Sequence, residues 1–197
     1  MKEKTSKHSL LISISKIISN FFNPIVSLII YYIVFNNAET TYDKGFSNLW
    51  ALLLILALPC IVWIIWNVKK GRYTNMDVSN REQRKSLYVV IVFLCFIYLA
   101  FEFVVHQHLD YEILFLWILL ILMQISNFFI KSSMHTSLNI FVAFLFLNFD
   151  IRWGIFWFIL SIIIGITRII LKRHTLAEVI SGGNLACLVG VAYYLVN

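Results

Sequence analysis

Long runs of apolar residues constrain the fold of this chain more than any other feature of its sequence. Residues 49–66 form a continuous stretch without a charged side chain, and comparable runs follow along the chain. Such a run is a candidate membrane-spanning helix, because about 20 helical residues cross the hydrocarbon core of a bilayer. Hydrophobic residues make up 60% of the chain and charged residues 13%, which leaves too little polar surface for a water-soluble globule. The bilayer is therefore the expected solvent.

Backbone hydrogen bonding decides which structure crosses the bilayer. Every N–H and C=O in hydrocarbon must be paired within the protein, and the runs are too long and too uniformly apolar for barrel strands. We predict an all-α, polytopic transmembrane helix bundle with about seven spans. These lie near residues 17–36, 47–68, 87–105, 112–130, 136–149, 153–171 and 177–196. The first span is interrupted near Pro24, so residues 9–22 are alternatively an amphipathic helix at the membrane surface.

The basic residues are distributed unevenly over the two predicted faces. Following the spans places the N-terminus and the loops 69–86, 131–135 and 172–176 on one face. Only Lys44 and Arg152 fall on the other face, so fourteen of the sixteen lysines and arginines share the first. The positive-inside rule explains such a bias without any further function, and a basin that attracts a lipid phosphate explains it equally. Charge alone leaves both interpretations open.

The segment from Thr167 to Glu178 joins the last two predicted spans and carries the clearest chemical pattern. His174 and Glu178 are four residues apart, so on a helix they share a face and the carboxylate can accept the imidazole N–H. A histidine oriented in this way is a candidate nucleophile. Arg168, at the end of the preceding span, is a candidate phosphate ligand because its guanidinium is a planar fork of donors.

Two further polar clusters fall on the same predicted face. In the segment Lys131–Ser137, Ser133 and His135 stand at the start of a span, where unpaired N–H groups favour an anion. The loop before the third span supplies the cations Lys70, Arg81 and Arg84. We expect Asp77 or Ser79 to cap the helix that follows this loop.

The order and spacing of these three clusters resemble the membrane-bound type 2 phosphatidic acid phosphatase (PAP2) superfamily over roughly residues 47–196. The third family motif is Ser-Arg, five residues, His, three residues, Asp, and this chain has Thr167-Arg168, His174 and Glu178 at that spacing. The second, Pro-Ser-Gly-His, is matched as Ser132-Ser133-Met134-His135. The first, Lys, six residues, Arg-Pro, is not matched in spacing, and Lys70 with Arg81 and Arg84 is its approximate substitute.

The resemblance implies a six-helix core and phosphoryl transfer through a phosphohistidine, without a metal ion or cofactor. It assigns His174 as nucleophile, Glu178 as the residue that orients it and His135 as the acid for the leaving lipid oxygen. It assigns charge stabilisation at the phosphate to Arg168, Arg84, Arg81, Lys70 and Ser133. Glutamate at 178 and methionine at 134 depart from the pattern, so a weakened or altered activity is one expectation.

On this basis we expect residues 1–46 to be a basic tail with the first hydrophobic or interfacial segment, and residues 47–197 to be the catalytic bundle. The expected function is a membrane-integral PAP2-type acid phosphatase whose partner is a membrane lipid bearing a phosphate or diphosphate, with no role for nucleic acid. The expected location is the cell membrane, as a multi-pass protein of the bacterial inner membrane. The alternatives are a phosphotransferase of the same superfamily and a non-enzymatic protein that binds or transports anionic lipids.

Overall fold

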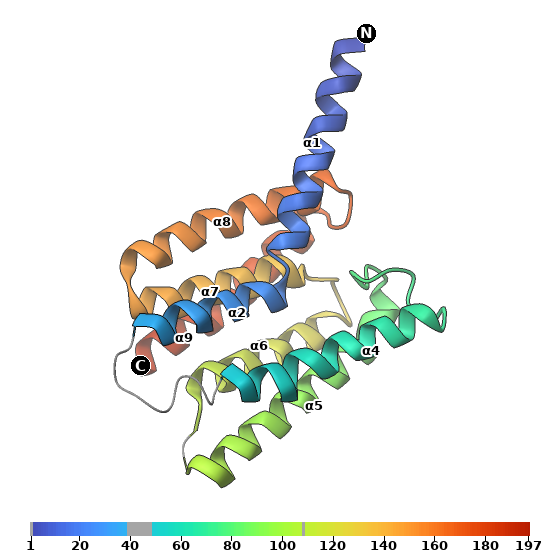
Figure 1. Cartoon of the computed structure of the whole chain (residues 1–197). Coiled ribbons are helices and arrows are strands. Elements are labelled where there is room, and N and C mark those ends of the chain that lie inside the picture. Colours follow the sequence, from blue (N-terminus) through green and yellow to red (C-terminus); the bar gives the residue numbers. More distant parts are fainter. Residues whose placement is uncertain (1, 39–48, 108) are drawn as a thin grey trace. The chain divides into compact units, whose positions relative to one another are not determined.

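The computed structural model describes residues 2–38, 49–107 and 109–197, with side chains over 9–35, 49–107 and 109–197. All regular structure within these ranges is helical, which confirms the predicted all-α class. The chain divides into two compact units (Figure 1). The first unit contains residues 1–28 and 132–197, and the second contains residues 29–131. The predicted division at residue 46 and the lysine at position 44 lie outside the described residues.

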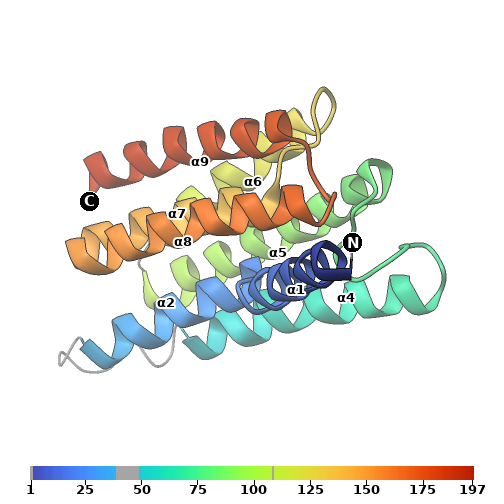
Figure 2. The same ribbon diagram turned by 90° about the horizontal axis from the view of Figure 1, so that it is seen from above.

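The first unit is built around α7, Met134–Phe149. This helix packs against both α8, Ile151–Ile170, and α9, Leu176–Val196 (Figures 1 and 2). α1, Lys2–Phe21, packs against α8. Small residues permit the close approach, because a Cβ at Gly190 would overlap the ring of Phe144. The sequence therefore places glycine where two helices touch.

Side-chain caps fix where the helices of the first unit begin. Ser133 caps α7 and Asp150 caps α8, the latter by accepting hydrogen bonds from the backbone N–H groups of Arg152 and Trp153. At the start of α9, Thr175 and Glu178 form a reciprocal capping box. Each cap satisfies N–H groups that have no partner within the helix itself.

α1 is followed by a sharp break before α2, Pro24–Ala38, and the two helices meet at 56°. Pro24 cannot donate a backbone hydrogen bond, so it favours a new helix start. Asn23 caps that start by accepting from the N–H groups of Ile25 and Val26, both at 3.1 Å. The carbonyl of Phe22 accepts a hydrogen bond from Asn139 Nδ2 of α7 at 3.1 Å. The break is therefore satisfied by side chains of the same unit, as an interrupted helix in a membrane requires.

The second unit contains α4, Leu58–Lys69, α5, Arg81–His106, and α6, Tyr111–Ser126, together with residues 29–38 of α2. A π-helical turn, η1, Leu52–Ala57, precedes α4. It lies just before Pro59, whose ring displaces the carbonyl one turn earlier and favours such a widened turn. The predicted cap of α5 was wrong: Asn80, and not Asp77 or Ser79, accepts the hydrogen bond from Glu82 N at 2.9 Å. Asn80 directly precedes the helix, as an N-cap must.

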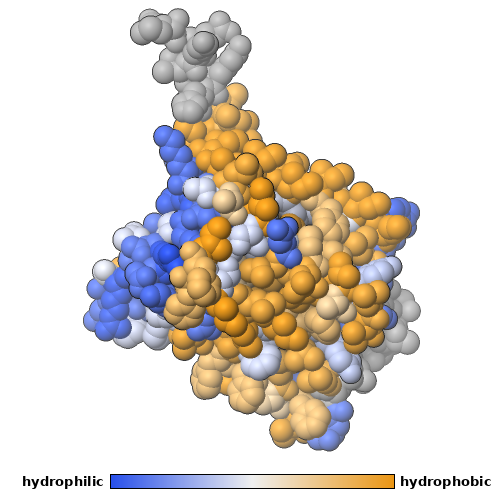
Figure 3. Space-filling model, turned by 180° about the vertical axis from the view of Figure 1, so that it is seen from behind, coloured by the Kyte–Doolittle hydropathy of each residue, from blue (hydrophilic) through white to orange (hydrophobic). Residues whose placement is uncertain are grey.

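Within the described part of the chain, four helices are long and apolar enough to cross a membrane: Leu49–Lys69, Arg81–His106, Ile151–Ile170 and Leu176–Val196. A fifth span results if the bent pair of α1 and α2 counts as one crossing. α6 and α7 are apolar but have 16 residues each, which at 1.5 Å per residue is roughly 24 Å against a hydrocarbon core of about 30 Å. The seven-span count therefore stays a prediction. Apolar residues cover most of the face drawn in Figure 3, as the surface of a multi-pass membrane protein requires.

Candidate active site

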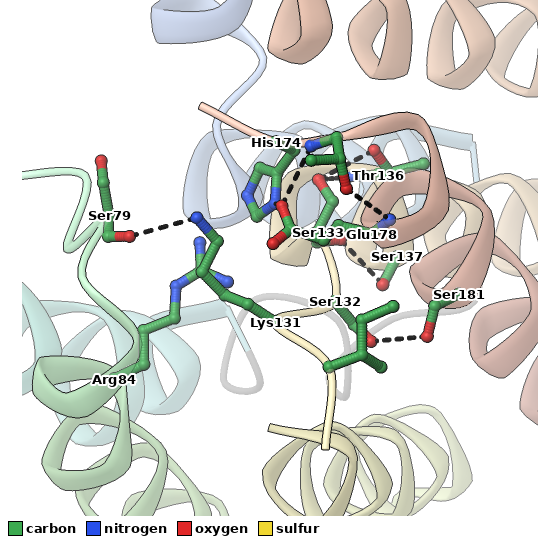
Figure 4. A network of polar contacts seen from close by, with 12 residues as sticks. Ser79, Arg84, Lys131, Ser132, Ser133, Thr136, Ser137, His174, Glu178 and Ser181 are labelled. Carbon is green, nitrogen blue, oxygen red and sulfur yellow. Dashed lines mark hydrogen bonds and ion pairs between the residues drawn. The ribbon is translucent and has the colours of Figure 1, made fainter. Parts of the chain in front are cut away.

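His174 and Glu178 form the centre of the candidate site, in the first unit. Nδ1 of His174 lies 2.9 Å from Oε2 of Glu178, and the imidazole is buried (Figure 4). The sequence predicted this contact for a last helix that begins by His174. The contact is present, but α9 begins at Leu176, so His174 reaches Glu178 from the loop before the helix. The backbone N–H of His174 donates to the carbonyl of Arg168 at 3.3 Å, so the loop between α8 and α9 is closed on itself. The contact with Glu178 therefore orients the ring of His174, and the hydrogen bond to Arg168 fixes its backbone.

The contact with Glu178 selects one tautomer of the His174 ring. An ionised carboxylate only accepts hydrogen bonds, so the ring nitrogen that faces it, Nδ1, carries the proton. The lone pair of the neutral imidazole then lies on Nε2. A buried imidazole with its lone pair on Nε2 and its N–H oriented by a carboxylate is chemically equipped to act as a nucleophile or a base.

The N-terminus of α7 lies against the first turn of α9. The backbone N–H of Ser133 donates to the carbonyl of Glu178 at 3.0 Å. The hydroxyl of Ser133 is buried. It accepts hydrogen bonds from the backbone nitrogen of Thr136 at 3.4 Å and from the hydroxyl of Thr136 at 3.0 Å. His135 stands in the same first turn of α7, half-buried. The second predicted cluster is therefore attached to the turn that carries Glu178.

A second set of contacts joins the N-terminal end of α7 to α9. Ser137 Oγ lies 2.8 Å from the carbonyl of Ser133 and 2.9 Å from that of Gly182, and Ser132 Oγ lies 2.8 Å from Ser181 Oγ (Figure 4). Gly182 has no room for a side chain, since a Cβ there would lie 2.6 Å from Ser137 Oγ. Close packing of α7 and α9 thus fixes the position of Ser133 relative to Glu178.

Arg168 lies at the end of α8 and is buried. Its Nη1 donates to the hydroxyl of Ser19, on α1, at 2.8 Å. The sequence predicted Arg168 as a site residue but did not identify Ser19 or Asn139, the latter of which also donates to the carbonyl of His135 at 2.8 Å. The only local signal for Ser19 is its polar character in an apolar segment, and nothing in that segment indicates which helix it contacts.

The three remaining predicted cations belong to the second unit. Arg81 Nε donates to the carbonyl of Asn127 at 2.6 Å, and Arg84, which is buried, donates through Nε to the carbonyl of Val78 at 3.0 Å. Lys70 is exposed at the end of α4. Arg84 therefore helps to fix the loop that precedes α5, and Arg81 joins the start of α5 to the end of α6. Whether the three cations meet the phosphate of a substrate at His174 stays a prediction.

Among the described residues, no three His, Cys, Asp or Glu side chains gather in a way that would hold a metal ion. The comparison of the chain with family models, curated proteins and solved structures found no match. The resemblance to the PAP2 superfamily therefore rests on the sequence alone, on the third motif and the partly matched second motif.

Proposed function

We propose that this protein is a membrane-integral phosphatase that hydrolyses a lipid phosphate or diphosphate through a phosphohistidine at His174. The observation that carries the proposal is the 2.9 Å contact between His174 Nδ1 and Glu178 in a buried position. This contact leaves the nucleophilic lone pair on Nε2. It also stabilises the positive charge that the ring acquires when Nε2 bonds to phosphorus.

In the first step of the proposed reaction, the Nε2 lone pair of His174 attacks phosphorus. A nitrogen–phosphorus bond forms while the bond from phosphorus to the lipid oxygen breaks, and that oxygen leaves with the electron pair. Protonated His135 gives its proton to the leaving oxygen. The leaving group is the lipid alcohol for a phosphomonoester, and the lipid monophosphate, which departs through the bridging oxygen, for a diphosphate.

In the second step, water attacks the phosphohistidine. The water oxygen bonds to phosphorus, the nitrogen–phosphorus bond breaks, and its electron pair returns to Nε2 of His174. Neutral His135 takes the proton from water and is thereby recharged for the next turnover. Each step needs proton transfer and charge stabilisation, which the side chains of this chain supply.

Charge stabilisation is assigned to Arg168 and to the N-terminus of α7, both within the first unit. Phosphoryl transfer places negative charge on three equatorial oxygens, and arginine is suited to pairs of such oxygens. A lipid substrate arrives laterally through the bilayer. The site recognises its phosphate headgroup and not its acyl chains.

The location at the cell membrane of a bacterium is part of the proposal. The excess of lysine and arginine on the predicted active face favours the cytoplasmic side. Labelling of single cysteines introduced at positions 72–80 in intact cells, with a reagent that does not cross membranes, measures the side directly. Labelling in intact cells would assign the active face to the outer side.

The test of the proposed reaction is the pair His174→Ala and His106→Ala. Purified protein in detergent with EDTA is assayed against a panel of lipid phosphates and diphosphates, and the phosphoenzyme is trapped from labelled substrate by an alkaline quench. We expect His174→Ala to lose turnover by about 10³-fold or more and to trap no label, because the nucleophile is gone. His106 lies exposed at the end of α5, in the second unit, so its variant should match the wild type. Equal turnover of the two variants would refute the assignment.

A non-enzymatic lipid-binding protein is the second candidate, and one observation favours it. Oε2 of Glu178 also accepts the backbone N–H of Thr175 at 3.1 Å, so the carboxylate has a structural role as part of a capping box. A binder would retain phosphate affinity in the wild type without releasing inorganic phosphate. A phosphotransferase would instead move the labelled phosphoryl group to an added acceptor, so analysis of the products separates all three.

A further inference from the structure

We infer that α1 contributes to the phosphate site through Ser19, which positions the guanidinium of Arg168. The inference rests on the proposed function, since it concerns how Arg168 meets a phosphate group. It goes beyond the three motifs, because Ser19 lies in the N-terminal segment, outside the region of the PAP2 resemblance. The contact that carries it is the 2.8 Å hydrogen bond from Arg168 Nη1 to Ser19 Oγ.

Both partners of this hydrogen bond are removed from solvent. Ser19 is 1% exposed and Arg168 is 3% exposed. A buried guanidinium that loses a hydrogen-bond acceptor suffers a large desolvation penalty, so the Ser19 hydroxyl constrains where the planar group lies. The backbone of Arg168 also accepts hydrogen bonds from the N–H groups of Arg173 and His174, at 3.0 and 3.3 Å. The same residue thus connects α1 to the loop that carries the proposed nucleophile.

The chemical nature of Ser19 favours positioning over neutralisation. A serine hydroxyl is uncharged, so it accepts one N–H of the guanidinium and leaves the positive charge in place. A carboxylate at the same position would compete directly with a phosphate for that charge. A hydroxyl therefore orients the fork of Arg168 while preserving its attraction for an anion.

α1 is held in register for this role by a second polar contact at its C-terminal end. Asn139, fully buried on α7, donates to the carbonyl of Phe22 at 3.1 Å and to that of His135 at 2.8 Å. The hydroxyl of Ser27 donates to Asn139 Oδ1 at 2.8 Å, on the other side of the break. The end of α1 is consequently fixed to α7 beside the turn of His135 and to α8 at Arg168. These two attachments fix the position of Ser19 relative to Arg168.

The test compares Ser19→Ala with Ser15→Ala, because Ser15 is buried on the same helix one turn earlier and 2% exposed. The probe is inorganic phosphate, and binding to the full chain in detergent is measured as a shift in Tm over a phosphate titration, which does not require turnover. We expect the phosphate Kd of Ser19→Ala to rise about 10-fold, as for loss of a hydrogen bond to a charged group. Ser15→Ala should bind like the wild type. Ser19→Cys, which keeps a similar volume but is a weak acceptor, should also bind weakly and serves if Ser19→Ala does not fold.

A double-mutant cycle with Arg168→Ala separates positioning from a merely structural role. If Ser19 acts through Arg168, removing the hydroxyl adds no further loss of phosphate affinity in the Arg168→Ala background. Equal and additive losses in both backgrounds would overturn the inference, as would phosphate binding in Ser19→Ala that equals that of Ser15→Ala.

Turnover measured alongside distinguishes failure of this inference from failure of the proposed function. A wild type that hydrolyses lipid phosphate while Ser19→Ala binds phosphate normally refutes only the role of Ser19. A wild type that binds phosphate but neither hydrolyses lipid phosphate nor traps label refutes the enzymatic function, while weakened binding in Ser19→Ala still supports the positioning of Arg168. A wild type that neither binds nor hydrolyses refutes both.

Discussion

Gly182→Ala tests whether the close packing of α7 on α9 builds the site. A Cβ at Gly182 would lie 2.6 Å from Ser137 Oγ, 2.9 Å from the carbonyl oxygen of Ser133 and 3.0 Å from its nitrogen. The serine hydroxyl can rotate away, but the two backbone atoms cannot. Since ordinary contact begins at 3.4 Å, α9 must move from α7 by at least 3.4 − 2.9 = 0.5 Å at this point.

The movement affects both stability and the site. Overpacking a close helix contact costs about 1–3 kcal/mol, and weakening the hydrogen bond from Ser133 N to Glu178 O adds about 1 kcal/mol. For a chain of this length, about 2–4 kcal/mol corresponds to a fall in Tm of roughly 5–15 °C. A misplacement of 1 Å costs about 10²-fold in rate, so a shift of half that size should lower kcat on the order of 10-fold. The single added methyl group of Gly182→Ala should therefore lower both Tm and kcat.

The neighbouring glycine provides the matched control. A Cβ at Gly183 would meet only Ile140 Cδ1, at 3.4 Å, which is ordinary contact. Gly183→Ala should leave Tm unchanged or slightly raised, because alanine is the better helix former. The measurements are thermal unfolding of purified protein in detergent and hydrolysis of the best lipid phosphate. If Gly182→Ala and Gly183→Ala have the same Tm, the proposed steric role of Gly182 is wrong.

Five further substitutions give distinct outcomes. Glu178→Gln keeps an acceptor for the capping box but removes the carboxylate charge, so turnover should fall about 10- to 100-fold at nearly unchanged Tm, whereas Glu178→Ala should lower both. Asn139→Leu should lower the unfolding free energy by about 3 kcal/mol, because it leaves the carbonyl at the α1 break unpaired, and Ser27→Ala should cost less; equal Tm values would contradict this. The Arg152 side chain and backbone N–H hold the pKa of Asp150 at about 2 instead of 3.8, so this carboxylate stabilises the folded chain above pH 3.8 and loses that contribution as the pH falls toward 2. Arg152→Ala should move the pKa of Asp150 back toward 3.8 in a carbon-13 NMR titration, and an unchanged midpoint would show that the arginine side chain is not the cause.

Local sequence patterns predicted the features of this protein that depend on neighbouring residues. The apolar runs predicted helices, and the four-residue spacing of His174 and Glu178 predicted their contact. The helices follow from the apolar runs, but the contact arises differently from the prediction: α9 begins at Leu176, so His174 lies in the preceding loop and meets Glu178 of the first helical turn from outside the helix. The cap of α5 was missed by one residue, since Asp77, Ser79 and Asn80 are all good caps and only the start of the helix selects among them.

Features that depend on contacts between distant residues could not be predicted in the same way. The hydrogen bonds of Ser19 to Arg168 and of Phe22 to Asn139 join positions more than one hundred residues apart. A polar residue within an apolar run signals that a partner exists, but the run itself does not identify the partner. The number of spans also depends on contacts between helices. A helix shorter than the bilayer, such as α7, is stabilised by the helices around it and not by its own length.

The glutamate at position 178, where the PAP2 pattern has aspartate, is accounted for by the start of α9. One carboxylate oxygen, Oε2, lies 2.9 Å from His174 Nδ1 and 3.1 Å from Thr175 N. The capping box needs a side chain at the third helical position that is long enough to reach back to the N-cap backbone, and glutamate meets this requirement. The backbone carbonyl of the same residue accepts from Ser133 N, which attaches α7. The orientation of the imidazole, the start of α9 and the position of α7 therefore depend on one residue, so a change that moves any of them moves the proposed nucleophile.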